Sequence, residues 1–116
     1  MSQQLLVDLY GCKSEVLDDL ENVVQIAREA IKDIGADIVE ECSHKFEPVG
    51  VTYIAVITTS HFSIHTWPEY GYAAIDVFSC KEDVPQNIID FLADKFSAKE
   101  INEKRYERII DREMKY

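Results

Sequence analysis

Short apolar runs and one long apolar stripe alternate along the first third of the chain. Residues 5–10 are rich in aliphatic side chains and end at Gly11, which predicts a β-strand. Apolar side chains then recur at steps of three and four residues, which predicts an amphipathic helix that Ser14 caps and Gly35 ends. Acidic side chains that alternate with this apolar stripe are typical of the solvated face of a helix. The stripe consists of Val16, Leu17, Leu20, Val23, Val24, Ala27 and Ile31, and the acids are Glu15, Asp18, Asp19 and Glu21.

The middle of the chain has the pattern of consecutive strands. A predicted strand over residues 38–46 is followed by turn residues at 48–50. Residues 51–58 are apolar on both parities, which predicts a strand in the centre of the sheet. Residues 68–71 form another turn, and residues 72–78 read as a further apolar strand.

The last third predicts a second helix and an edge strand. Asp83 can cap the helix, with Pro85 in its first turn. The densely charged tail fits an exposed edge strand, with a frayed helix over residues 106–115 as the alternative. The helix stripe consists of Ile88, Ile89, Leu92, Ala93 and Phe96, and the alternating strand residues are Ile101, Glu103, Arg105 and Glu107. Together these elements predict an α+β fold, a two-layer sandwich with both helices on one face of a mostly antiparallel sheet.

Composition narrows the functional class. The chain has 116 residues, so residues 1–116 are expected to form a single domain, and 47% of them are apolar, as in a folded globule. The net charge of −10 argues against nucleic acid and against a basic membrane-surface module, and it suits small cationic ligands. The longest apolar run, residues 54–57, is far too short to span a bilayer. Three cysteines without paired spacing favour a reducing cytoplasm.

Residues 58–80 concentrate hydroxyl, imidazole, aromatic and thiol side chains. On a strand over residues 60–67, the odd-numbered side chains would share one face while Phe62 and Ile64 face the core. That polar face is either the wall of a pocket or ordinary surface. Its members are His61, Ser63, His65 and Trp67.

Three chemistries fit such a segment to different degrees. A metal site could use His61, His65 and a cysteine, but no third ligand has matching spacing. A serine hydrolase could use Ser60 or Ser63, but the Gly-x-Ser-x-Gly elbow is absent. The third is self-processing, in which a serine hydroxyl in a strained turn attacks the preceding carbonyl and a nearby histidine moves the proton.

The run from residue 60 to residue 76 closely resembles the prokaryotic S-adenosylmethionine decarboxylase family. It reads SHFSIHTWPEYGYAAID, and the match extends through Phe78 and Cys80. The resemblance continues more loosely through the predicted helices and the turn at residues 46–51.

The resemblance implies a self-cleaving proenzyme. The cut would fall between Thr59 and Ser60, giving fragments of 59 and 57 residues, and Ser60 would become a pyruvoyl group. Thr59 stands where the family commonly has glutamate. Thr52 matches a hydroxyl residue that assists processing, His65 matches the processing histidine, and Cys80 matches the proton donor of the decarboxylation.

The implied chemistry is physically consistent. A pyruvoyl carbonyl condenses with a substrate amine and accepts the electrons released as CO₂ leaves, and a nearby thiol can return a proton. The positive sulfonium of S-adenosylmethionine suits an acidic protein and aromatic faces. Phe46 and Trp67 are therefore candidates to flank the adenine or sulfonium, and Glu69 to accept from the ribose.

The resemblance also implies a place in metabolism and a partner. The product would be the aminopropyl donor for spermidine synthesis, and two protomers would form a homodimer that shares residues across its active sites. Two alternatives stay open. One is a pyruvoyl decarboxylase of another amino acid, such as arginine or ornithine, because the pocket and not the pyruvoyl group selects the substrate. The other is an uncleaved, non-enzymatic homologue.

Overall fold

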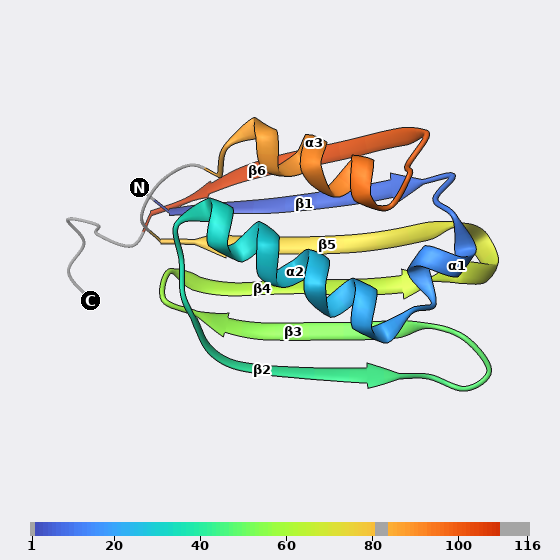
Figure 1. Cartoon of the computed structure of the whole chain (residues 1–116). Coiled ribbons are helices and arrows are strands. Elements are labelled where there is room, and N and C mark those ends of the chain that lie inside the picture. The colour runs from blue at the N-terminus through green and yellow to red at the C-terminus, as the bar shows by residue number, and fades with distance from the viewer. Residues whose placement is uncertain (1, 81–83, 110–116) are drawn as a thin grey trace, which may run out of the picture.

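The computed structural model describes residues 2–80 and 84–109, which form one sheet with helices on one side (Figure 1). The sheet has six strands in the order β2-β3-β4-β5-β1-β6, and every neighbouring pair is antiparallel. These strands are β1 (Ser2–Tyr10), β2 (Ile38–Lys45), β3 (Val51–Ile57), β4 (Ser60–Trp67), β5 (Tyr72–Ser79) and β6 (Glu100–Arg108). The expected α+β sandwich is confirmed.

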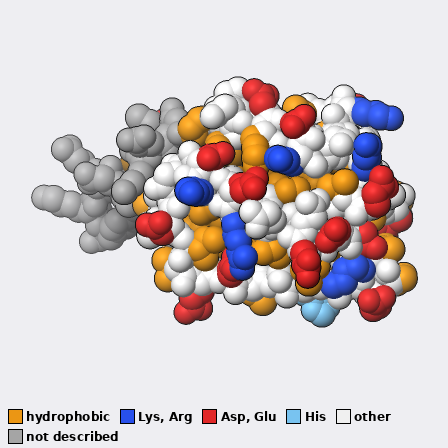
Figure 2. Space-filling view, in the orientation of Figure 1, with side chains coloured by type: hydrophobic (Ala, Val, Ile, Leu, Met, Phe, Trp, Pro, Cys, Tyr) orange, Lys and Arg blue, Asp and Glu red, His pale blue; other side chains and the backbone are white. Residues whose placement is uncertain are grey.

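The core lies between the sheet and its two long helices. The helices are α1 (Ser14–Leu17), α2 (Leu20–Ile34) and α3 (Gln86–Lys95), and a 3₁₀ turn, η1 (Pro68–Tyr70), joins β4 to β5. The predicted stripes of α2 and α3 face inward, and the solvent side of the helices mixes acidic, basic and apolar side chains (Figure 2). Fully buried Tyr53, Phe62 and Phe96 are among the largest core side chains. Over the described ranges, no helix is both long enough and apolar enough to cross a membrane.

The predicted first helix is in fact two helices. Helix α1 ends at Leu17, and α2 begins after Asp19, whose carboxylate accepts a 3.2 Å hydrogen bond from the Asn22 N–H. The predicted cap at Ser14 is wrong, because Ser14 is already the first helical residue. The predicted end at Gly35 is confirmed, since this residue adopts a left-handed φ of 86° that glycine tolerates best.

The C-terminal elements agree with one of the two predicted alternatives. Strand β6 pairs with β1 at the edge of the sheet, so a helix beginning at residue 106 is wrong, and residues 110–115 lie outside the described part. Asp83 also lies outside it, and Pro85 precedes the first helical residue of α3 as its N-cap.

The sheet face opposite the helices carries exposed apolar side chains. Strand β3 lies second from the edge, and its outward residues Ile54 and Val56 are 47% and 52% exposed. Trp67 on β4 is exposed on the same face. We call this surface the open face. It explains why residues 51–58 are apolar on both parities although helices cover only one side of them.

Candidate active site

Ser60 begins β4 in a strained backbone conformation. Its φ of 143° lies in the region that residues with a side chain rarely adopt. The preceding turn is tied to the segment after α2, because Thr58 N–H donates to the Asp37 carbonyl at 2.9 Å and Asp37 N–H donates to Thr58 Oγ1 at 3.0 Å. Thr59 is buried. The peptide between Thr59 and Ser60 therefore follows an anchored turn and a buried residue, and its second residue is strained.

Cys80 contacts this same peptide. Its backbone N–H donates a 2.8 Å hydrogen bond to the Thr59 carbonyl oxygen, and its neighbour Ser79 is paired with Ser60 across β4 and β5. The Cys80 side chain itself is exposed. A donor at this position polarises the Thr59 carbonyl and stabilises negative charge that develops on its oxygen under nucleophilic attack.

Thr52 and His65 form a second group on the open face. They are paired across β3 and β4, and a 3.0 Å hydrogen bond joins Thr52 Oγ1 to His65 Nδ1. As predicted, Phe62 and Ile64 are fully buried on the helix side, but Ser63, expected on the polar face, is buried as well. The bond to Thr52 orients the imidazole ring of His65.

Within one chain, the structure does not bring His65 to Ser60. The two residues lie five positions apart on the same extended strand, which corresponds to roughly 16 Å at the usual rise per residue. A proton transfer requires about 3 Å between heavy atoms. Ser60 and Cys80 therefore lie at one end of β4, and the pair of Thr52 and His65 lies near the other.

A cavity of about 650 Å³ adjoins the Thr52–His65 pair. It contains all three predicted substrate contacts, Phe46, Trp67 and Glu69. Phe46 comes from the loop after β2, Trp67 from the end of β4, and Glu69 from η1. The three residues expected to contact the substrate thus line one cavity together with Thr52 and His65.

A row of aromatic rings that the sequence pattern did not indicate continues from this cavity. The rings of His65 and Trp67 lie 6.4 Å apart, those of Trp67 and Tyr72 5.3 Å, and those of Tyr72 and Tyr10 5.3 Å. Tyr72 donates a hydrogen bond to Asp8. Burial of the phenol, and to a smaller extent this hydrogen bond, raises the pKa of Tyr72. Tyr72 lies directly opposite Trp67 across the β4–β5 hairpin, a pairing that the turn at residues 68–71 could have indicated.

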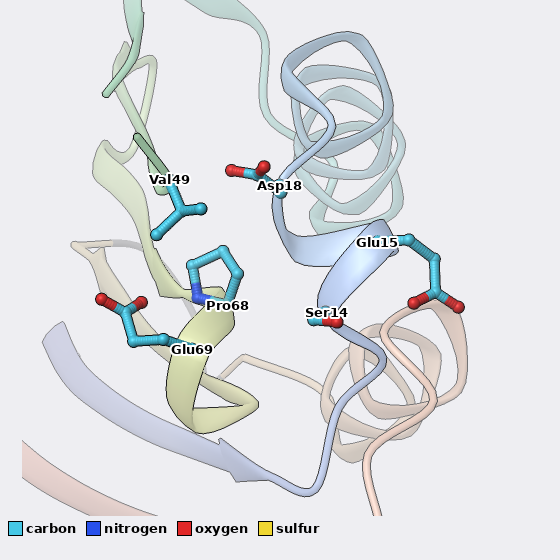
Figure 3. A pocket seen from close by; sticks show the side chains of 6 residues that line it. All are labelled: Ser14, Glu15, Asp18, Val49, Pro68 and Glu69. Carbon is cyan, nitrogen blue, oxygen red and sulfur yellow. The ribbon is translucent and has the colours of Figure 1, made fainter. Parts of the chain in front are cut away.

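A smaller cavity of about 450 Å³ lies beside the first and shares Val49 and Glu69 with it. Val49 and Pro68 face Asp18 across this space, while the Glu15 carboxylate points away (Figure 3). Asp18 accepts hydrogen bonds from Gly50 N–H at 2.8 Å and pairs with Lys45 Nζ at 3.0 Å. The hydrogen bond from Gly50 N–H is the main cause that lowers the pKa of the Asp18 carboxyl, and the bond from Lys45 lowers it further.

Asp18 therefore has a structural role, although the sequence predicted only a position on the solvated face of a helix. It joins the end of α1 to the loop that carries Phe46. Among residues 2–80 and 84–109, no three His, Cys, Asp or Glu side chains gather closely enough to hold a metal ion.

Known proteins share this fold and this motif. A family model described as S-adenosylmethionine decarboxylase matches residues 3–109. The chain belongs to the S-adenosylmethionine decarboxylase family. Its relatives include S-adenosylmethionine decarboxylase proenzymes of Moorella thermoacetica, 44% identical over 93% of this chain and 87% of that protein, and Thermotoga maritima, 42% identical over 93% and 84%.

A solved structure supports the same assignment. The crystal structure of the adenosylmethionine decarboxylase from Aquifex aeolicus is similar with a TM-score of 0.88 and 29% identity, covering 100% of this chain and 97% of that one. The resemblance drawn from residues 60–80 is thus confirmed for the family, the fold and the enzymatic class, a decarboxylase of S-adenosylmethionine.

Proposed function

We propose that this family member is a proenzyme that cuts its own Thr59–Ser60 bond and then decarboxylates S-adenosylmethionine with a pyruvoyl group derived from Ser60. The observation that carries the proposal is the strained Ser60, which follows a carbonyl that already accepts a 2.8 Å hydrogen bond from Cys80 N–H. The relatives' description as proenzymes supports it. The product serves as the aminopropyl donor for spermidine synthesis.

The first step is an attack within the chain. Ser60 Oγ adds to the Thr59 carbonyl carbon while Cys80 N–H holds the carbonyl oxygen, and such a donor is worth about 10²- to 10³-fold in rate. The carbon–nitrogen bond then breaks, the serine proton passes to the freed nitrogen, and an ester joins residues 59 and 60. A base next removes the Ser60 α-proton, and Thr59 leaves as a carboxylate. Loss of ammonia on hydration leaves the ketone at residue 60.

The surrounding residues fit the resulting group. Residue 60 is half-buried at the start of β4, and Cys80, whose side chain is exposed, is held against the same turn. When present, the pyruvoyl carbonyl supplies an electron sink for the decarboxylation. In this arrangement Cys80 Sγ delivers the proton to the substrate carbon.

The active site is completed by a second copy of the chain. Because His65 cannot reach Ser60 in its own chain, we place His65 of the partner subunit beside Ser60 in a homodimer. Two sheets packed by their open faces lie about 10 Å apart, and a two-fold axis across the strands reverses the ends of β4. The exposed Ile54 and Val56 would then be buried in the interface.

In this dimer the 650 Å³ cavity of one subunit opens toward the ketone of the other. The nucleoside of the substrate occupies the cavity between Phe46 and Trp67, and Glu69 accepts from the ribose hydroxyls. The aromatic faces and the net charge of −10 favour the positive sulfonium. Cys12, Cys42 and Cys80 are all unpaired, which supports a reducing, cytoplasmic compartment.

Two measurements test the proposal. Intact mass spectrometry of the purified chain of 13.4 kDa should find fragments of residues 1–59 and 60–116. Release of labelled CO₂ should be rapid from S-adenosylmethionine and absent from arginine and ornithine. One unbroken chain after long incubation contradicts the proposal and indicates the non-enzymatic alternative, and release from arginine or ornithine indicates a different substrate.

A further inference from the structure

One hydroxyl beside the cleavage point has no use in the steps above. Thr59 is only 4% exposed, and its Oγ1 atom has no hydrogen-bond partner within the described ranges, 2–80 and 84–109. Two other threonine hydroxyls have partners, one directly before Thr59 in the chain and one at the far end of β4. Thr58 Oγ1 accepts from Asp37 N–H, and Thr66 Oγ1 accepts from Val51 N–H and donates to the Leu17 carbonyl.

A buried hydroxyl without a partner destabilises the state that contains it. Such groups persist where another state satisfies them. The state to consider is the one in which the peptide bond of Thr59 is breaking, because this side chain and the leaving nitrogen are attached to neighbouring atoms of the same backbone.

The nitrogen of Ser60 changes character in that state. In the intact peptide its lone pair is delocalised into the carbonyl, so the nitrogen accepts no hydrogen bond. When Ser60 Oγ bonds to the Thr59 carbon, delocalisation is lost and the nitrogen becomes an amine that can accept one. A donor held close to it then gains a partner that the precursor did not offer.

We propose that Thr59 is a further catalytic residue of the self-cleavage, whose hydroxyl donates a hydrogen bond to the Ser60 nitrogen as that nitrogen leaves. The bond formed is Ser60 Oγ to Thr59 C, and the bond broken is Thr59 C to Ser60 N. The nitrogen takes its proton from the Thr59 hydroxyl along this hydrogen bond, and the serine proton replaces it on Thr59 Oγ1. The interaction exists in the transition state and not in the precursor, and only such a difference accelerates a reaction.

This inference rests on the proposed cleavage. Valine is the matched substitution for Thr59, because it keeps the shape of threonine without the hydroxyl. The rate at which the two fragments appear is measured for the parent, T59V and T59S. T59V should cleave about 10- to 100-fold more slowly than the parent. T59S, which keeps the hydroxyl, should stay within about threefold of the parent.

A second measurement separates this role from a structural one. In the uncleavable S60A background, adding T59V should raise the melting temperature by about 3–8 °C, because it removes the unsatisfied hydroxyl. Adding T66V in the same background is the control. It should lower the melting temperature, since the Thr66 hydroxyl is bonded to Val51 and Leu17. A purely structural threonine would not give a variant that is more stable and cleaves more slowly.

The outcomes are distinct. Slow T59V cleavage together with a higher melting temperature supports the inference. T59V cleaving at the parent rate, or S60A/T59V melting at or below S60A, overturns it while the proposed cleavage stands. A parent chain that never cleaves overturns the proposed cleavage and this inference with it.

Discussion

Mixing two uncleavable variants tests whether the active site is shared between subunits. H65A keeps Ser60 but lacks the histidine, and S60A keeps the histidine but lacks the nucleophile. Along one strand these residues are roughly 16 Å apart, well beyond the reach of about 3 Å for proton transfer. In a dimer of one H65A chain and one S60A chain, Ser60 of the first subunit would face His65 of the second. Each mixed dimer should therefore cut one of its two chains.

The expected yield follows from random pairing. Equal amounts of the two variants, refolded together, give about half of all dimers as mixed pairs. About half of the H65A chains should then be cut, and none of the S60A chains, as read by intact mass spectrometry. H65A mixed with the double variant S60A/H65A is the matched control and should give no cut. Absence of cutting in the first mixture, with mixed dimers verified by native mass spectrometry, refutes the shared site.

Three further predictions concern individual side chains, two beside the cavity and one set of thiols. Thr52→Val removes the 3.0 Å partner of the histidine and should slow self-cleavage roughly tenfold, the equivalent of one hydrogen bond, whereas Thr52→Ser should not. Asp18→Asn should raise the KM for S-adenosylmethionine and lower the melting temperature at pH 7. The folded state lowers the pKa of Asp18 from 3.8. The stabilisation by ionised Asp18 is therefore present above pH 3.8 and is lost as the pH falls through the lower pKa of the folded state. Melting temperatures measured over a series of pH values test this. Cys80 is exposed and should alkylate before Cys12, since burial raises the pKa of Cys12 to about 11; equal labelling rates of these two thiols would contradict the structure.

The sheet and the apolar stripes could be predicted from the sequence because periodicity is a local property. The alternating residues of β6 identified the edge strand even in a densely charged tail. The break between α1 and α2 could not be seen this way. Leu17 and Leu20 keep the helical step across it, and only the Asp19 cap, formed with Asn22, shows where the second helix begins.

The composition of the site could be predicted, but the way its two groups come together could not. Phe46, Trp67 and Glu69 line the same cavity, as expected from the motif. The separation of Ser60 and His65 follows from the strand predicted over residues 60–67, but the sequence of one chain does not show which surface would bring a histidine to Ser60. The apolar character of β3 on both sides predicts a strand in the centre of the sheet, but β3 lies second from its edge. Among the described residues of one chain, nothing covers its outward side, and a partner surface in the proposed dimer would explain why that side is apolar.

After the chain is cut, residue 60 should carry a reactive ketone. Incubating the purified protein with S-adenosylmethionine and cyanoborohydride traps an amine bound to a ketone, and mass spectrometry of peptides locates the adduct. We predict an adduct on the first residue of fragment 60–116, and none on S60A. An unmodified serine at the start of that fragment, with CO₂ still released, would contradict the account.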